Sequence, residues 1–248
     1  MLRKCIILFV LLAISFGTRA QKIVTDRPDQ TESSLTVPLK SLQIESGILI
    51  INEESGLIKK ILIPTSLFRY GLTDRLELRV VQQFENLEND ATSQTNFGIS
   101  DLVIGAKIQL LKKENINIQI AFLSHLILPT GSNELTNDEF GTVNKLAISH
   151  TISDHIGLGY NIGYDNFGEG KGDFSYSLSS GLSLTNKVGT YVEFYGTYTK
   201  FSHWGTNFDS GLTYLVKDNL QLDISFGLGL NCEMHYFSLG CSWNISTL

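Results

Sequence analysis

Nine charged residues lie in segments that otherwise alternate between apolar and small polar residues. From Leu76 to Val80, for example, Glu77 and Arg79 alternate with three apolar residues. Side chains two positions apart in an extended chain point the same way, so these charges share one face. Charges on one face can pair with one another, or they can select ions and orient a polar solute. The nine candidates for this polar face are Glu45, Arg69, Glu77, Arg79, Asp101, Lys107, Lys145, Glu193 and Asp223.

A second group of charges lies closer to the N-terminus, outside any alternating segment. It surrounds Pro28 and consists of Asp26, Arg27, Asp29 and Glu32. These residues could pair with the first group as a plug, contact a partner protein, or form a solvated tail. A calcium site built from the three carboxylates is a weaker alternative, because their spacing matches no calcium-binding loop. We expect an ordered role, as a plug or as a partner contact.

Hydrolytic chemistry has little support in the residues. A Ser–His mechanism needs both side chains within hydrogen-bond reach. Ser124 and His125 are adjacent, so they point to opposite faces of an extended chain. His150 and His203 are the remaining candidate bases near strand ends, and neither has an identifiable nucleophile beside it. We therefore expect no enzymatic activity, no cofactor and no metal ion.

The elements that must position these charges are β-strands. From Leu220 to Leu230 every second residue is apolar, and the residues between them include Gln221, Asp223 and Ser225. A period of two indicates a strand with one apolar and one polar face. Twelve such segments are predicted, at residues 41–52, 58–72, 75–86, 97–111, 115–129, 140–152, 155–165, 172–185, 188–200, 206–217, 219–230 and 234–246.

The predicted connections alternate between short turns and longer polar loops. Asp and Asn recur in the short turns, which they favour because both tolerate left-handed backbone and bond to their own backbone. Hairpins chained end to end in this way build a meander, and the asymmetry is typical of outer-membrane barrels. The short turns fall at 72–75, 112–114, 153–154, 186–187 and 217–218; the longer links fall at 53–57, 87–96, 131–139 and 166–171, with brief links at 201–205 and 231–233.

Three observations favour an apolar face that points outward, toward lipid. Segments of about ten residues tilted by about 40° span the ~25 Å apolar band of an outer membrane. The polar face consists mostly of Gly, Ser, Asn, Gln and Thr, with dispersed charges. Aromatic residues gather near strand ends on the apolar face, as they do at membrane interfaces. They are Phe68, Tyr70, Tyr214 and Trp243 at one rim and Phe84, Tyr164, Phe174, Tyr176 and Tyr198 at the other.

We therefore predict an all-β fold, a single antiparallel up-and-down transmembrane β-barrel of about twelve strands over residues 41–248. Twelve tilted strands give a backbone diameter of roughly 24 Å, which leaves about 10 Å or less once side chains intrude. The charges of the polar face then either tune the passage of a solute or fill a narrow lumen with ion pairs. Pro64 lies inside a predicted strand and cannot donate to its ladder, so we expect a bulge there.

The start of the chain has the features of an export signal. A basic first stretch, an apolar run from Ile6 to Phe16 and small residues before Gln21 predict a signal peptide over residues 1–20. Residues 21–40 then form a polar N-terminal segment ahead of the barrel.

Composition narrows the partners. Removal of the leader would take three of the 19 basic residues and none of the 25 acidic ones, which leaves a net charge of −9. This balance argues against a nucleic-acid partner. Cys232 and Cys241 would lie on the order of 25–30 Å apart along the chain, too far for a disulfide. Cys241 has the parity of an apolar-face residue.

Several motifs carry a family resemblance. The runs Thr25-Asp-Arg-Pro-Asp-Gln-Thr-Glu-Ser33 and Leu42-Gln-Ile-Glu-Ser-Gly47 resemble the start of outer-membrane proteins of the MetA-pathway of phenol degradation family. The segments 69–78, 98–102 and 126–131 are similar to strand and turn motifs of that family. The resemblance covers nearly the whole chain after the leader. It implies an outer-membrane β-barrel described as a transporter, and it implies no catalytic residues.

These observations together predict a channel or transporter in the bacterial outer membrane. We expect passive or facilitated passage of a small solute, hydrophobic or aromatic ones included, with membrane lipid as the other partner. A non-conducting structural or adhesive barrel is the alternative, and an outer-membrane lipid hydrolase is a third and weaker one.

Overall fold

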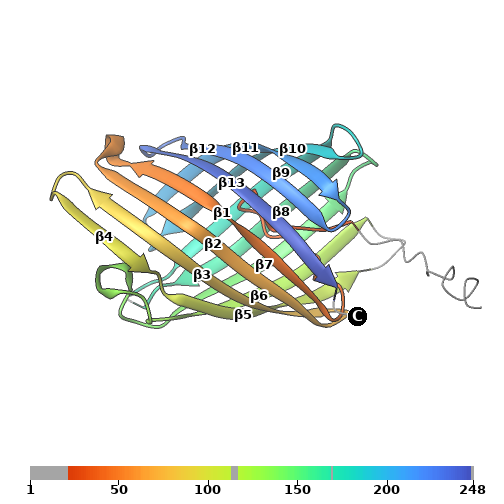
Figure 1. Ribbon diagram of the computed structural model, residues 1–248, viewed down its shortest axis with the longest axis horizontal. Coiled ribbons are helices and arrows are strands. Elements are labelled where there is room, and N and C mark those ends of the chain that lie inside the picture. The colour runs from red at the N-terminus through yellow and green to blue at the C-terminus, as the bar shows by residue number, and fades with distance from the viewer. Residues whose placement is uncertain (1–21, 113–116, 169, 247–248) are drawn as a thin grey trace, which may run out of the picture.

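The computed structural model describes residues 22–112, 117–168 and 170–246, and it is an all-β structure (Figure 1). The predicted leader lies outside the described residues. Two single 3-10 turns, Glu54–Gly56 and Asn133–Leu135, lie in loops. The strands are β1 (Ser41–Glu53), β2 (Ile58–Thr73), β3 (Leu76–Asn89), β4 (Gln94–Ile99), β5 (Leu102–Lys112), β6 (Ile118–Leu128), β7 (Gly141–Thr151), β8 (Ile156–Asn166), β9 (Asp173–Ser183), β10 (Val188–Thr199), β11 (His203–Lys217), β12 (Leu220–Gly229) and β13 (Met234–Ser246).

The strands form one closed antiparallel sheet. Each strand except β4 pairs with the next along the chain, β3 pairs with both β4 and β5, and β1 pairs with β13 to close the ring. β4 and β5 lie end to end on the same edge of β3, because β4 pairs with residues 84–89 of β3 and β5 pairs with residues 76–81. The ring therefore has twelve positions, and the predicted twelve-stranded barrel is confirmed.

The prediction of one strand over residues 97–111 is wrong. The ladder breaks at Ser100 and Asp101, where the Asp101 carboxylate accepts hydrogen bonds from the backbone N–H groups of Thr130, Gly131 and Asn137 at 2.9–3.1 Å. The loop after β6 is thereby fastened at the break between β4 and β5. The side chain of Asp101 binds this loop, which a periodicity argument does not reveal.

The link between β10 and β11 is tighter than predicted. Lys200 and Phe201 adopt left-handed backbone, with φ of 49° and 54°. Two such residues in succession reverse the chain in a compact turn. Thr199 consequently pairs with His203, so β11 begins three residues earlier than expected.

The predicted bulge at Pro64 is confirmed. The register between β1 and β2 shifts between Gly47 and Leu49 on one strand, and the register between β2 and β3 shifts between Leu62 and Thr65 on the other side. Ile63 and Pro64 lie in this interval and both are exposed. Because proline has no N–H to donate, an unpaired position is where a strand accommodates it.

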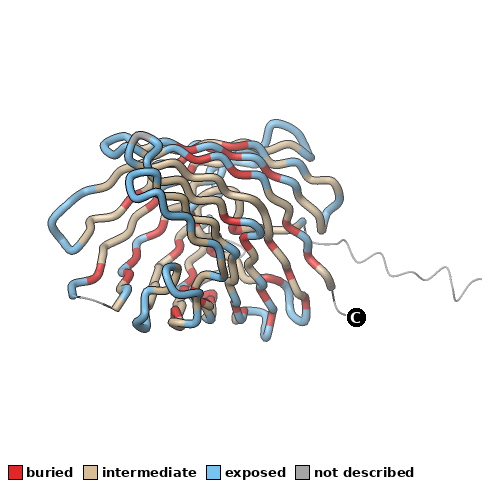
Figure 2. Tube along the Cα trace, turned by 60° about the vertical axis from the view of Figure 1, so that its left-hand side comes forward, coloured by how far each residue is buried: buried red, intermediate tan, exposed pale blue. Residues whose placement is uncertain are grey.

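The burial pattern is the reverse of that in a water-soluble core. On β12, Phe226 is 49% exposed, whereas Asp223 on the other face is 5% exposed. The largest fully buried side chains include Arg69, Arg79 and Lys107. Buried positions recur along the strands, where they alternate with half-buried and exposed ones, and the loops are mostly exposed (Figure 2). An apolar exterior over a charged interior is the arrangement of a barrel surrounded by lipid. None of the described helical turns is long and apolar enough to cross a membrane.

Aromatic residues form contacts at the long-loop end of the barrel. Tyr198 stacks on Trp204 with ring centroids 4.5 Å apart, and Tyr176 meets Trp204 edge-on at 5.6 Å. At the short-turn end, Tyr214 and Trp243 are both 48% exposed. Amphipathic rings at both rims suit the two membrane interfaces.

Candidate functional site: the charged lumen

Residues 22–38 form a loop inside the barrel that enters and leaves at the short-turn end; we call it the N-terminal loop (Figure 1). At its start, the Ile23 N–H donates to the Asp218 carbonyl at 2.7 Å, and just after its end the Lys40 N–H donates to the Gly71 carbonyl at 2.8 Å. Between these points the loop reaches across the lumen. Its contacts with the wall fall on the polar faces of the strands.

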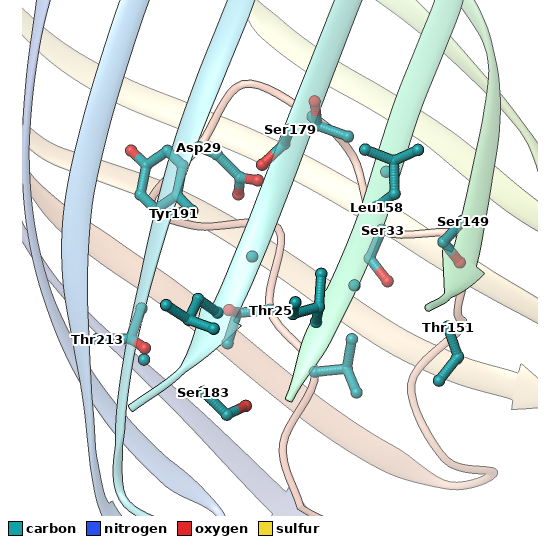
Figure 3. Close-up of a pocket in the computed structure, with 18 of the residues that line it drawn as sticks. Thr25, Asp29, Ser33, Ser149, Thr151, Leu158, Ser179, Ser183, Tyr191 and Thr213 are labelled. Atoms are coloured by element: carbon teal, nitrogen blue, oxygen red, sulfur yellow. The ribbon is translucent and has the colours of Figure 1, made fainter. Parts of the chain in front are cut away.

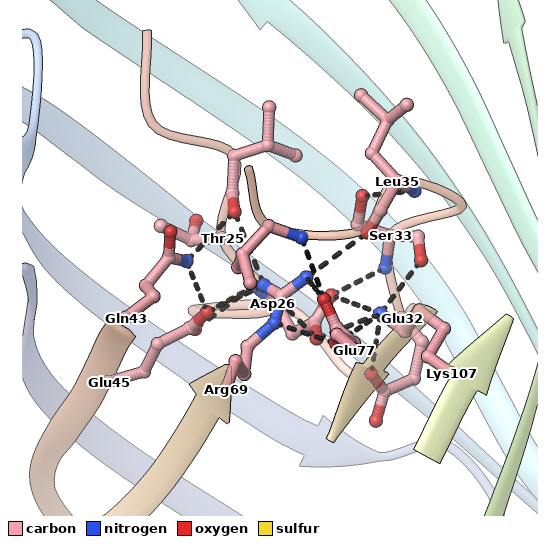
Figure 4. A network of polar contacts seen from close by, with 12 residues as sticks. Thr25, Asp26, Glu32, Ser33, Leu35, Gln43, Glu45, Arg69, Glu77 and Lys107 are labelled. Carbon is pink, nitrogen blue, oxygen red and sulfur yellow. Dashed lines mark hydrogen bonds and ion pairs between the residues drawn. The ribbon is translucent and has the colours of Figure 1, made fainter. Parts of the chain in front are cut away.

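The first cluster, which we call the central network, joins this loop to β1, β2, β3 and β5 (Figure 4). Its cations are Arg69, Arg79 and Lys107, and its carboxylates are Asp26, Glu32, Glu45 and Glu77. Asp26 approaches Arg79 at 2.6 Å and Lys107 at 2.9 Å. Arg69 approaches Glu45 at 2.8 Å and Glu77 at 3.0 Å.

Burial makes these ion pairs depend on one another. The side chains of Arg69, Glu45, Glu77 and Lys107 have no exposed surface. A buried charge left without its partner costs several kcal/mol, so each member holds the others in place. Burial alone would raise the pKa of Asp26, but the charges of Arg69, Lys107 and Arg79 hold it well below its usual range.

The backbone of the loop is bound by the same wall carboxylates. The N–H groups of Asp26 and Arg27 donate to Glu45 at 3.0 Å each, and the Val37 N–H donates to Glu77 at 2.8 Å. Two wall acids thus satisfy both the arginines and the loop backbone. Such backbone capture fixes the path of the loop as well as its charge.

Arg27 points away from the central network, toward β12 and β13. Its Nη2 atom donates to Asp223 Oδ1 at 2.9 Å and to Ser238 Oγ at 2.8 Å. Gly47 and Gly240 pair in the β1–β13 ladder, and both lie directly against the Arg27 guanidinium. A Cβ built at either position would collide with the Arg27 side chain. Glycine is therefore needed there to leave room for the arginine.

A second cluster gathers carboxylates on β10 and β11. The Gln30 N–H donates to Glu193 at 2.7 Å, the Thr31 hydroxyl also donates to Glu193, and the Tyr236 hydroxyl donates to Asp209 at 2.6 Å. Glu193 and Asp209 face each other in the ladder. Burial and the neighbouring Glu193 raise the pKa of Asp29, on the loop, well above its usual range.

The structure brings together most of the residues predicted from parity. Glu45, Arg69, Glu77, Arg79 and Lys107 meet in the central network with Asp26 and Glu32, while Glu193 and Asp223 bind the loop on the other side of the lumen. Lys145 lies half-buried and is in none of the ion pairs found among the described residues. Asp101, as described above, binds a loop backbone.

Three functional residues escaped the sequence reasoning. Asp209 is fully buried opposite Glu193, and Tyr236 bonds to it. His125 accepts a hydrogen bond from the Nε of Arg79 at 3.0 Å. Parity would have selected Asp209, which shares its face with Asn207 and Gly211. It could not have selected His125, because Leu123 and Ile127 on the same face are apolar.

The side chains considered for hydrolysis do not form a nucleophile–base pair within the described part of the chain. His125 faces the lumen, whereas the Ser124 hydroxyl donates to the amide oxygen of Asn144 at 2.8 Å. His150 stacks on Tyr160 and lies 3.1 Å from its hydroxyl.

The fold is similar to those of solved outer-membrane barrels. An outer membrane channel from Pseudomonas putida F1 superposes with a TM-score of 0.70 at 14% identity, over 86% of this chain and 98% of that chain. The KdgM porin gives a TM-score of 0.56 at 10% identity, over 81% and 98%. The NanC porin gives 0.50 at 8% identity, over 80% and 98%. At these identities the likeness concerns the fold.

Sequence comparison defines the family. None of the curated proteins matches the chain. The profile of the family described as "Putative MetA-pathway of phenol degradation" matches residues 25–245, which include the N-terminal loop and nearly all of the barrel. The chain therefore belongs to this family, as the motifs around Pro28 and in the strand turns predicted.

Proposed function

We propose that the protein is a channel of the bacterial outer membrane that passes small solutes, and that the N-terminal loop plugs its lumen. The observation that supports this most is the division of side chains, with charges inside the ring and apolar residues outside. Charged groups in membrane proteins face a water-filled pathway or pair with one another. Here the wall charges line the lumen and pair with the loop. The fold likeness to a channel and two porins adds support.

The plug proposal is supported by how the loop is bound. Its backbone donates to Glu45, Glu77, Glu193 and Asn161, which belong to four different strands. Its side chains complete ion pairs that the wall lacks on its own, because Asp26 supplies the carboxylate shared by Arg79 and Lys107. A solvated tail would satisfy neither set of groups.

A non-conducting barrel is the second candidate, and the completeness of the central network favours it. All three cations of that network are paired, which stabilises a filled lumen. The two candidates differ in whether the loop ever leaves, so they can be separated by measuring passage with the loop present and with it removed.

The experiment compares refolded residues 21–248 with a variant that lacks residues 22–38, by single-channel recording and by liposome swelling with small sugars. Folding of both is checked by the mobility shift of an unboiled barrel on a gel. We expect small or brief conductance steps from the intact protein and larger, longer ones from the folded variant. Equal conductance would exclude a plug, and two folded barrels without conductance would exclude a channel.

Two substitutions that weaken the binding of the loop to the wall provide a milder variant, which is used if the deletion variant does not fold. Changing Asp26→Asn together with Glu32→Gln removes two negative charges beside Arg79 and Lys107 without changing side-chain size. The matched control is Glu134→Gln with Asp90→Asn, which changes charge equally at two exposed positions. Only the first pair should raise conductance.

A further inference from the structure

A cavity of about 560 Å³ lies beside the N-terminal loop, between the loop and the short-turn ends of β7 to β10 (Figure 3). We call it the vestibule. It is lined on one side by loop residues such as Thr25 and Ser33, and on the other by strand residues such as Ser179 and Ser183. Residues of the turn between β7 and β8 also line it, which places its mouth at the short-turn end.

Two paired glycines leave part of the strand wall of the vestibule without side chains. Gly157 on β8 and Gly181 on β9 face each other in the ladder. A Cβ built at Gly181 meets nothing within 4 Å, and one built at Gly157 meets only the His150 carbonyl at 4.0 Å. Neither residue has a left-handed φ. Packing and backbone conformation therefore do not require glycine at either position, unlike Gly47 and Gly240.

Glycine in a strand weakens it relative to alanine, because the chain loses more freedom on folding and no side chain packs. At Gly157 and Gly181 neither packing nor backbone conformation compensates for this cost. The absence of side chains at these two positions keeps the volume of the vestibule open. An independent observation points to an occupant. Tyr191, a residue only 6% exposed, lines the vestibule, and its hydroxyl is buried behind this wall without a hydrogen-bond partner among the described residues.

The charged loop residues Arg27 and Glu32, which line the vestibule, are already paired, and Asp154 lies exposed in the turn at its mouth. Arg27 pairs with Asp223, and Glu32 pairs with Arg79 and Lys107. Asp29 lies near Tyr191 and Ser179 at the inner end (Figure 3). Burial and the neighbouring Glu193 raise its pKa. What remains for a ligand inside the vestibule is a set of hydroxyls and short apolar stretches.

We propose that the vestibule is a binding site for a small, uncharged solute that carries hydroxyl groups, and that this solute enters while the loop is in place. The volume lies within the roughly 300–1,000 Å³ that small-molecule sites usually have. The inference deepens the proposed channel function, since the site would hold a solute at the short-turn end of the pathway. It does not depend on the loop being displaced.

Thiol labelling tests the site directly. Gly181→Cys is introduced together with Cys232→Ser and Cys241→Ser, and the rate of reaction with a small neutral methanethiosulfonate is measured on the folded, full-length barrel. Glycerol and ribitol are the uncharged probes, and lysine and glutamate are the charged ones. We expect ribitol to slow labelling at least several-fold, while the charged probes leave the rate unchanged.

The matched control is Gly205→Cys in the same background. Gly205 lies on β11 at the long-loop end, where a Cβ would make only ordinary contacts at 3.7 Å. Its labelling rate should not respond to ribitol. A further variant, Ser183→Ala, removes an exposed hydroxyl that lines the vestibule, and we expect protection at Gly181→Cys to need about five- to tenfold more ribitol.

The outcomes separate this inference from the channel proposal. If ribitol does not protect Gly181→Cys, or protects Gly205→Cys equally, the vestibule is not the site, even where the wild type conducts. If ribitol protects Gly181→Cys but no variant conducts, the site stands and the channel proposal fails. Filling the vestibule with Gly181→Leu provides a second measurement, because it should abolish swelling by ribitol while the barrel still shows its gel shift.

Discussion

Replacing Asp26 by asparagine tests whether charge holds the N-terminal loop in the lumen. The carboxylate of Asp26 lies 2.6 Å from Arg79, 2.9 Å from Lys107 and 3.3 Å from Arg69. An asparagine keeps the size of the side chain and can still accept the Ser33 N–H bond at one oxygen. What it loses is the negative charge shared by the three cations.

The magnitude follows from the burial of these partners. Breaking a buried ion pair by removing one member costs about 3–5 kcal/mol, because the other charge stays buried without compensation. In this lumen the loop can leave, so the cost falls on docking of the loop rather than on the barrel. At about 1.4 kcal/mol for each factor of ten, undocked molecules should become roughly a hundred- to several thousandfold more frequent.

Two assays report on docking. Proteolysis of folded barrels in detergent should release the loop of the Asp26→Asn variant far faster than that of the wild type, and single-channel recording should show longer open times. Asp90→Asn, an equal charge change in an exposed turn away from the loop, is the control. If Asp26→Asn and the wild type are cleaved at the same rate and open equally often, charge pairing does not hold the loop and the reasoning is wrong.

Three further predictions concern the glycines beneath Arg27, the carboxyls around Asp29, and the loop that Asp101 binds. Gly240→Ala should displace Arg27 and speed loop proteolysis, whereas Gly181→Ala, with open space around its Cβ, should not. Asp29 lies near Glu193 and Asp209, and its pKa is raised when the loop is docked. Docking should therefore weaken as pH rises from about 4 through that raised pKa. Asp29→Asn should remove this pH dependence in the same proteolysis assay. Asp101→Asn leaves one carbonyl oxygen for three N–H donors, so the loop from Thr130 to Asn137 should lose about 1–3 kcal/mol of local stability in hydrogen exchange, with conductance unchanged.

The barrel could be predicted because its information is local. A period of two fixes the direction of each side chain, so Leu222 and Asp223 had to face opposite sides wherever the strand lay. The break after Ile99 could not be predicted in this way. The break depends on hydrogen bonds that Asp101 accepts from backbone N–H groups about thirty residues away. Nothing in the sequence next to Asp101 indicates these contacts.

The site was predictable in membership but not in pairing. Parity placed Arg79 and Lys107 on one face, but it could not show that both would meet Asp26, because that contact depends on the path of the N-terminal loop. The vestibule could not be predicted from the sequence for a related reason. Gly157 and Gly181 look like ordinary strand glycines until the space around each of them is known.

The arrangement of wall charges gives the loop its specificity. Strands β2, β3 and β5 contribute Arg69, Arg79 and Lys107, an excess of positive charge over Glu77. Halfway around the ring, β10 to β12 contribute the buried acids Glu193, Asp209 and Asp223. Asp26 and Glu32 turn to the first side and Arg27 to the second, so each of these three charges meets the opposite sign. Asp29 is the exception, because it lies beside Glu193 and its pKa is raised there. An undocked lumen would therefore present a basic wall opposite an acidic one. Exchanging Asp26 and Arg27 would turn like charges toward both walls, so the order of these two charges, and not only their number, fits the loop to this barrel.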